Sequence, residues 1–339
     1  MLALLSCAFG MASCDVHEFP KILDNSARVP FTLHLNCNPQ LPIHEEINYT
    51  TRSDNQLTEH DMRYIINVYR SVDGENFIRQ ADTTIVYTRH LDEEQDHSIL
   101  LNLNQGFYNF IVWCDHVNKG SIGDKYYNTN DFAIITYSNR ENYEGCNDFK
   151  DAFRGTVQTT IQYDQYSDGN IVAQEASVQL ERPLAKFKFI STDLEEFIGQ
   201  VLESAASKGK TVSRTINPDD YRVVFRYTGF MPCSFNMFTN KPNDSWAGVS
   251  FNGKMIPLNE NEIELGFDYV FVNGTESKIK VAVEIYDKGG ELLSNTNAIE
   301  VPLVRSKLTI VRGNFLASKA SGGVGINTDF KGDFNIEIK

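Results

Sequence analysis

Apolar and polar residues alternate along most of the chain. In residues 29–36, Val29, Phe31, Leu33 and Leu35 occupy every second position between less apolar neighbours. This period of two is typical of a strand with one buried face. Further strand-like segments in the first half are 62–77, 83–89, 97–103, 106–117, 128–137, 157–163 and 170–183. Their short, regular spacing predicts a β-sandwich.

The same pattern returns in the second half, which begins at 183–191. Its later strand-like segments are 221–230, 263–274, 278–291, 301–313 and 330–339. We therefore expect a mainly β fold of two tandem β-sandwiches, an N-terminal domain at 15–182 and a C-terminal domain at 183–339.

One segment, 191–210, has the period of a helix instead. Its apolar residues fall three and four positions apart and form one face: Leu194, Phe197, Ile198, Val201, Leu202 and Ala205. Thr192 and Glu195 fit a capping box at its start. Gly209 is expected to end the helix, with Lys208 in its last turn.

The first residues form an apolar run that ends abruptly at Asp15. The run is shorter than the roughly 20 residues that a transmembrane helix needs, so it predicts an export segment. The basic region that normally opens such a segment is missing, which favours a start upstream of Met1. "MASC" resembles a bacterial lipobox, so that residues 1–14 would be a lipoprotein signal peptide and Cys14 the acylated first residue. "LLSC" at Cys7 fits the same pattern, and a plain signal peptide with incidental cysteines is the alternative.

Composition and charge narrow the class of protein. The chain has 339 residues, of which 41% are apolar and 22% charged, as in a foldable globular protein. Its net charge is −14 and it has no Lys/Arg-rich block, which argues against nucleic-acid partners and against a basic membrane-binding face. The 22 Phe and 15 Tyr favour strands over helices.

The remaining cysteines do not indicate a metal site. Cys37, Cys114, Cys146 and Cys233 lie far apart and show no CxxC spacing. They could form a disulfide in an oxidising compartment, with three ways of pairing all four, or remain small buried thiols. We expect no metal and no cofactor.

The sequence lacks the common motifs of catalysis and ligand binding. It has no GxSxG, HExxH or P-loop pattern, and 164–170 lacks the full calcium-loop pattern and is interpreted as a turn. The seven histidines are scattered. Trp113 and Trp246 could stack on sugars, although Trp113 lies in a strongly apolar strand and is expected in the core.

Five stretches together resemble one known family. They are "CDVHEFP" (14–20), 112–132, 151–157, "LERPLAKFKFIS" (180–191) and "GGVGINTDFKGDFNIEI" (322–338). They resemble the fimbrillin-like lipoproteins of Bacteroidetes, with FimB-type fimbrial anchor or accessory subunits of type V pili as the most similar group. The resemblance implies transthyretin-like Greek-key sandwiches, no enzymatic activity, and anchoring in the outer membrane through acyl chains such as palmitate. It also implies that subunits join by strand addition.

The C-terminal segment has the properties of a donor strand. A strand at a free chain end can leave its sheet without pulling a second connection, and 321–325 is rich in glycine. Phe334, Ile336 and Ile338 alternate with polar residues and could fill pockets of a partner subunit. An ordinary edge strand that never leaves is the alternative.

Arg28 directly precedes the first strand-like segment. In stalk pilins of this family, cleavage after an arginine removes the leading segment. An anchor would keep its lipid and stay uncut, so a charged strand flank is the preferred interpretation of Arg28.

The sequence thus predicts a lipid-anchored, surface-exposed outer-membrane protein that anchors or accompanies a fimbria and serves cell adhesion. Its partners would be other fimbrial subunits. A surface glycan-binding lipoprotein that uses Trp246 is the alternative, and a hydrolase is a third hypothesis.

Overall fold

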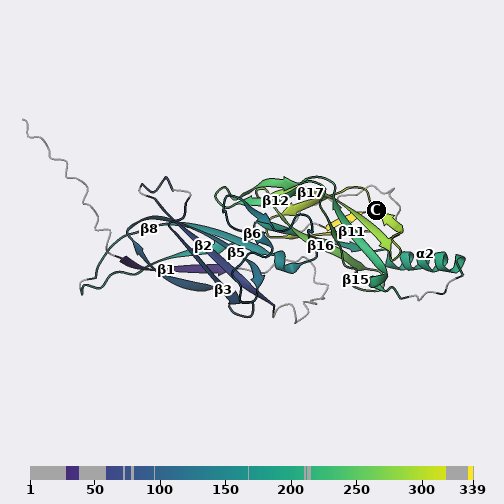
Figure 1. Ribbon diagram of the computed structural model, residues 1–339, viewed down its shortest axis with the longest axis horizontal. Coiled ribbons are helices and arrows are strands. Elements are labelled where there is room, and N and C mark those ends of the chain that lie inside the picture. Colours follow the sequence, from purple (N-terminus) through teal and green to yellow (C-terminus); the bar gives the residue numbers. More distant parts are fainter. Residues whose placement is uncertain are drawn as a thin grey trace, which may run out of the picture.

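The computed structural model describes residues 28–37, 59–71, 73–77, 80–94, 96–166, 168–209, 211 and 215–317, and the backbone of 335–338. The described residues are mainly β, which confirms the predicted fold class. Figure 1 shows two strand-rich bodies that follow one another along the long axis of the molecule.

The strands of the first half are β1 (Arg28–Cys37), β2 (His60–Ser71), β3 (Thr83–His90), β4 (His97–Asn104), β5 (Gly106–Asn118), β6 (Tyr127–Asn128), β7 (Ile135–Tyr137), β8 (Ala152–Ile161) and β9 (Gln174–Leu180). Those of the second half are β10 (Leu184–Ser191), β11 (Tyr221–Tyr227), β12 (Met231–Asn236), β13 (Lys241–Trp246), β14 (Ser250–Asn252), β15 (Ile256–Pro257), β16 (Ile263–Phe271), β17 (Glu276–Asp287), β18 (Leu292–Asn295), β19 (Ile299–Val304), β20 (Leu308–Gly313) and β21 (Asn335–Ile338). The helices are α2 (Leu194–Ser207) and the short 3-10 helices η1 (Asp148–Lys150) and η2 (Pro218–Asp220).

Two sheets form a sandwich in the first half. Their strand orders are β4-β1-β9 and β3-β2-β5-β8. The alternation predicted for β1 is confirmed, because its four apolar residues at odd positions from Val29 to Leu35 are at most 1% exposed. The Phe31 ring stacks on Phe110 of β5 with centroids 5.4 Å apart, which joins the two layers.

The second half packs sheet β15-β16-β10-β20-β21 with sheet β14-β11-β17-β18, in which β19 also pairs with β17. The segment 301–313, predicted as one strand, is two strands in different sheets. A turn separates them at Ser306, whose φ is 60°. The chain therefore crosses between the sheets at this turn, which a pattern of alternating residues cannot reveal.

A further sheet, β13-β12-β7-β6, takes strands from both halves of the chain. β7 pairs with β12 through Thr136–Ser234 and Ile135–Phe235. The segment 128–137, predicted as one strand, is instead the hairpin β6–β7. The proposed boundary between 182 and 183 stays a prediction; the pairing shows that part of the first half completes a sheet of the second.

β2 and β5 bury both of their faces. Tyr64 and Val112 point into the sandwich core of the first half. Ile65 and Trp113, which lie opposite one another in the β2–β5 ladder, point the other way into a cluster shared with the second half. A single hydrophobic cluster therefore links the two halves.

Helix α2 is present where predicted, and Leu194 and Phe197 on its apolar face are buried. Its predicted capping box is wrong. Asp193 is the N-cap residue and makes no side-chain cap bond, while the Thr192 hydroxyl donates to Asn314 at 3.0 Å. The reason is that β10 runs to Ser191, so that the helix starts one residue later than the box requires. Gly209 follows the C-cap Lys208 with a φ of 68°, which confirms the predicted helix end.

Candidate functional site

The C-terminal strand β21 lies at the edge of its sheet. It pairs in parallel with β20, from Ile310–Asn335 to Gly313–Ile338. Among the described strands β20 is its only partner. Phe334 lies outside the described residues, and only the backbone of Ile336 and Ile338 is described, so their proposed role as pocket-filling side chains stays a prediction.

The chain that leaves β20 is held by a buried carboxylate. The backbone N–H groups of Leu316 and Ala317 donate to Asp193 Oδ2 at 3.1 and 2.8 Å. The Phe315 N–H donates to Ser191 Oγ at 2.9 Å. These bonds hold residues 315–317, which follow β20, against Ser191 and Asp193.

Arg28 is the first residue of β1 and is exposed. β1 pairs with β4, and Pro30 of β1 lies opposite Asn102 of β4. Proline has no N–H to donate to Asn102. The Arg28 guanidinium donates to the Asn102 carbonyl at 3.3 Å. Arg28 thus has a structural contact at the strand flank. Its alternative role as a protease site stays a prediction, and Cys7 and Cys14 lie outside the described residues.

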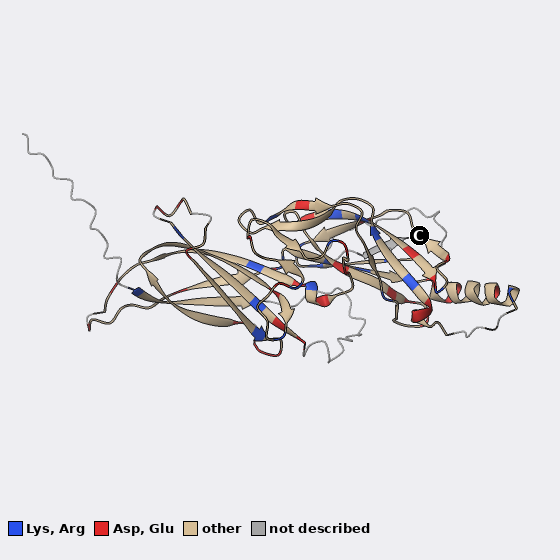
Figure 2. Cartoon of the chain, in the orientation of Figure 1, with Lys and Arg blue, Asp and Glu red and all other residues tan. Residues whose placement is uncertain are grey.

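The junction between the two halves contains a short charged segment, residues 148–151, which we call the clamp segment. Three of its residues form ion pairs. Asp148 pairs with Lys186 at 2.6 Å and Lys150 with Asp268 at 2.5 Å, both in the second half, and Asp151 pairs with Arg182, the last residue before that half, at 2.8 Å. Elsewhere on the molecule Lys and Arg are dispersed among Asp and Glu over both halves (Figure 2).

The Lys150–Asp268 pair is buried. Lys150 Nζ also donates to Tyr143 Oη at 2.6 Å and to the Glu144 carbonyl at 2.9 Å, so all three of its N–H groups are used. Tyr143 and Tyr227 both donate to Asp268 Oδ2 at 2.8 Å. Burial lowers the pKa of Lys150, and the Asp268 charge opposes that shift.

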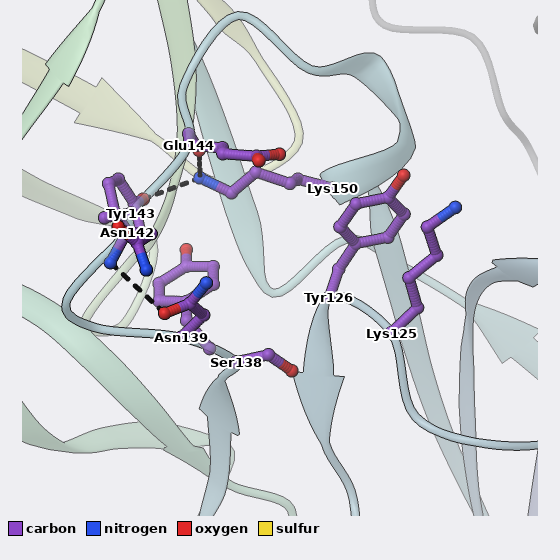
Figure 3. A pocket seen from close by; sticks show the side chains of 9 residues that line it. Lys125, Tyr126, Ser138, Asn139, Asn142, Tyr143, Glu144 and Lys150 are labelled. Atoms are coloured by element: carbon purple, nitrogen blue, oxygen red, sulfur yellow. Dashed lines mark hydrogen bonds between the residues drawn. The ribbon is translucent and has the colours of Figure 1, made fainter.

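Beside this pair lies an open hollow of about 220 Å³. Figure 3 shows Tyr143 on its left, Tyr126 with Lys125 on its right, and Lys150 with Glu144 along the top between them. A neighbouring hollow of about 420 Å³ shares Tyr126, Tyr143 and Glu144 with it. Because Asp268 already neutralises the Lys150 charge, Lys150 needs no anionic ligand in the first hollow.

The two tryptophans pack into the structure. Trp113 is fully buried, as predicted, with its ring edge-on to Tyr127 at 5.2 Å. Trp246 packs against Tyr137 and Tyr143, and the Arg140 guanidinium lies 5.8 Å from its ring centroid. Trp246 is half-buried and already has aromatic and cationic neighbours, and its use as a sugar platform stays a prediction.

The four cysteines of the described part of the chain are free thiols. Burial raises the pKa of Cys37 and of Cys233 to about 12 and that of Cys146 to about 11. Burial also raises the pKa of Cys114 well above its usual value. They therefore stay protonated near neutral pH, which makes them poor nucleophiles.

The described residues hold no cluster suited to a metal ion, because no three or more His, Cys, Asp or Glu side chains among them come together. No helix in that part of the chain is long and apolar enough to cross a membrane.

Sequence reasoning missed the clamp segment. Lys150 and Asp268 are 118 positions apart, and nothing in the sequence around Lys150, which lies between Asp148 and Asp151, indicates Asp268 as its partner. The only signal was Asp268, the single charge in the apolar run 265–272, where a carboxylate needs a buried partner.

The chain matches one family of proteins over most of its length. A family model described as a family of unknown function (DUF6562) matches residues 23–339. No curated protein matches the chain.

Among solved structures, the fimbrial anchor protein Mfa2 from Porphyromonas gingivalis is similar with 11% identity and a TM-score of 0.40, over 78% of this chain and 81% of that one. The tip fimbrial protein Mfa3 from the same organism, with a C-terminal truncation, has 9% identity and a TM-score of 0.42, over 92% and 98%. A fimbrial assembly protein from Parabacteroides distasonis has 11% identity and a TM-score of 0.40, over 92% and 99%.

Proposed function

This chain belongs to the family of unknown function DUF6562, and we propose that it is a lipid-anchored cell-surface subunit that anchors or accompanies a fimbria. In this proposal Cys14 carries the lipid in the outer membrane, and cell adhesion is the broader role. The protein acts by binding other subunits, and no catalytic step is assigned to it.

The observation that carries the proposal is the position of β21. Among the described strands it is paired along one side only, with β20. An edge strand can be given to a neighbouring subunit, where main-chain hydrogen bonds supply affinity and alternate side chains supply specificity. The resemblance of residues 322–338 to fimbrillin-like proteins supports the same role.

The strand is tested with two matched variants of the full chain. We expect Ile336→Asp to abolish co-purification of other fimbrial subunits, because a charge would enter an apolar pocket of the partner. Glu337→Gln, at the adjacent polar position, should leave co-purification unchanged. Equal binding by both variants would refute strand donation.

The anchor is tested by mass spectrometry of the protein from its native membrane, beside Cys14→Ala and Cys7→Ala. An acylated Cys14 followed by an intact chain supports an anchor. A mature protein that begins at Val29 without lipid would instead indicate a polymerising subunit. An unmodified N-terminus would refute lipid anchoring.

A further inference from the structure

The first sandwich has an open edge at β4. β4 is the end strand of sheet β4-β1-β9, and β1 is its only partner among the described strands. Its eight residues pair with β1 in one unbroken register, without a bulge. A long, regular edge presents unpaired N–H and C=O groups that can template pairing with another chain.

Other edges in the described structure carry protection that β4 lacks. β13 contains Pro242 together with charged residues, β14 and β15 have three and two residues, and β18 pairs across a register shift. β3 ends in Arg89 and His90. After His97 at its first position, β4 reads "SILLNLN" (98–104), with no charge and no proline.

Both faces of β4 have apolar surface left to bury. Leu100 on the outer face is 84% exposed, the largest value among the bulky apolar side chains of the described residues. On the inner face Ile99 and Leu101 are half-buried, at the margin of the sandwich core. A strand added beside β4 would cover this margin.

We propose that β4 pairs with β4 of a second copy of this chain, antiparallel and about a two-fold axis at Leu100. In this register Leu100 meets its own copy, Ser98 lies opposite Asn102, and Ile99 lies opposite Leu101. On the outer face, leucine then lies opposite leucine and the Ser98 hydroxyl opposite the Asn102 amide. On the inner face, Ile99 and Leu101 of both copies extend the margin of the sandwich core.

A second copy fits this edge because of its charge pattern. A two-fold axis places each strand residue opposite its symmetry mate, so that charges within 98–104 would bring like charges close together. β4 has none in that range. The pairing joins two three-stranded sheets into one of six strands, and it uses no residue of the C-terminal strand.

The test is the mass of the full chain in solution, measured by sedimentation velocity over a range of concentrations. We expect a monomer–dimer equilibrium that Leu100→Lys shifts at least tenfold towards monomer. The unfolding midpoint, measured where the wild type is monomeric, should not change.

Cysteine cross-linking tests the register. Opposite Cα atoms of an antiparallel pair are about 4.5 to 5.5 Å apart, which is within disulfide range. Leu100→Cys should therefore form a disulfide dimer on mild oxidation. Val86→Cys, on the edge strand β3 and 37% exposed, is the matched control and should not.

Three results would overturn the proposal: a monomer at every concentration, a dimer that Leu100→Lys leaves intact, or a Leu100→Cys variant that links only to another protein. Removal of residues 333–339 should leave the dimer in place. Failure of strand donation by β21 would thus be seen separately.

Discussion

Lys150 Nζ lies 2.5 Å from Asp268 Oδ1, and this buried contact joins the first half of the chain to the second. Lys150 belongs to η1, whereas Asp268 is in the middle of β16. Both side chains are at most 4% exposed, so each buried charge is neutralised by the other rather than by water. Burial of two charges adds little net stability by itself, but it penalises every arrangement in which they are separated. We interpret the pair as a determinant of how the clamp segment seats on β16.

Removal of one partner should therefore be costly. Lys150→Met leaves Asp268 buried with two phenol donors but no cation, and we expect a loss of about 3 to 5 kcal/mol in the free energy of unfolding. Asp268→Asn should have a similar effect. Urea unfolding measures both, and the double variant should be less unstable than the sum of the two changes.

The exposed pair Lys278–Glu300 supplies the control, since its side chains are 67% and 36% exposed. Lys278→Met should change the free energy of unfolding by no more than about 1 kcal/mol. If Lys150→Met and Lys278→Met lowered the free energy of unfolding equally, burial would not be what makes the Lys150–Asp268 pair important.

The β class, the alternation of β1 and the extent of α2 could be predicted from sequence because each depends on local periodicity. The split of 301–313 into β19 and β20 could not, since a strand that changes sheets keeps its alternating pattern. The pairing of β7 with β12 also escaped prediction. It joins Ile135 to Phe235, and no local sequence pattern around either residue indicates the other as its partner.

Of the candidate site, too, one part could be predicted from the sequence and another could not. The C-terminal segment was found from its alternation and its position at the chain end. The Lys150–Asp268 pair was not, because its two charges are 118 positions apart and meet only through tertiary packing.

Stability should fall steeply at alkaline pH. Burial raises the pKa of five phenols well above its usual value of about 10: Tyr127, Tyr137, Tyr143, Tyr227 and Tyr269. The unfolded chain loses these protons above about pH 10 while the folded chain keeps them, so their stabilisation is present below that pH and is lost above it. The lowered pKa values of Lys150 and Lys125, both caused by burial, act in the opposite direction but come from only two groups.

Urea unfolding at a series of pH values, with tyrosinate absorbance followed in parallel, measures this loss. Tyr227→Phe should make the decline shallower. The control Tyr166→Phe removes a phenol that is 59% exposed and should leave the slope unchanged. A stability that stays constant above pH 10 would refute the argument.

Two glycines should respond in opposite directions to alanine. A Cβ at Gly253 would lie 2.2 Å from the Leu265 carbonyl oxygen, which is backbone and cannot move aside. We expect Gly253→Ala to destabilise the protein by about 1 to 3 kcal/mol or more. Gly199 lies within α2, and a Cβ added there would meet no atom within 4 Å apart from the backbone of its own helix, so Gly199→Ala should stabilise by about 0.5 to 1 kcal/mol. Chemical denaturation measures both, and a destabilising Gly199→Ala would contradict the open space at that helix face.

Asp193 should control how firmly the chain is held as it leaves β20. Asp193→Ala leaves the Leu316 and Ala317 N–H groups without their acceptor, and each buried donor left unsatisfied costs about 1 to 3 kcal/mol. Asp193 is also the N-cap residue of α2 but makes no side-chain cap bond, so the helix itself should be little affected.

Hydrogen exchange followed by mass spectrometry separates the effect on the chain after β20 from an effect on the helix. We expect faster exchange in peptides that contain 308–317 and unchanged exchange in those from 197–207. Asp193→Asn keeps one carbonyl acceptor and should show a smaller increase. If exchange rises in the helix instead, Asp193 acts as its cap, and the C-terminal strand is held by β20 alone.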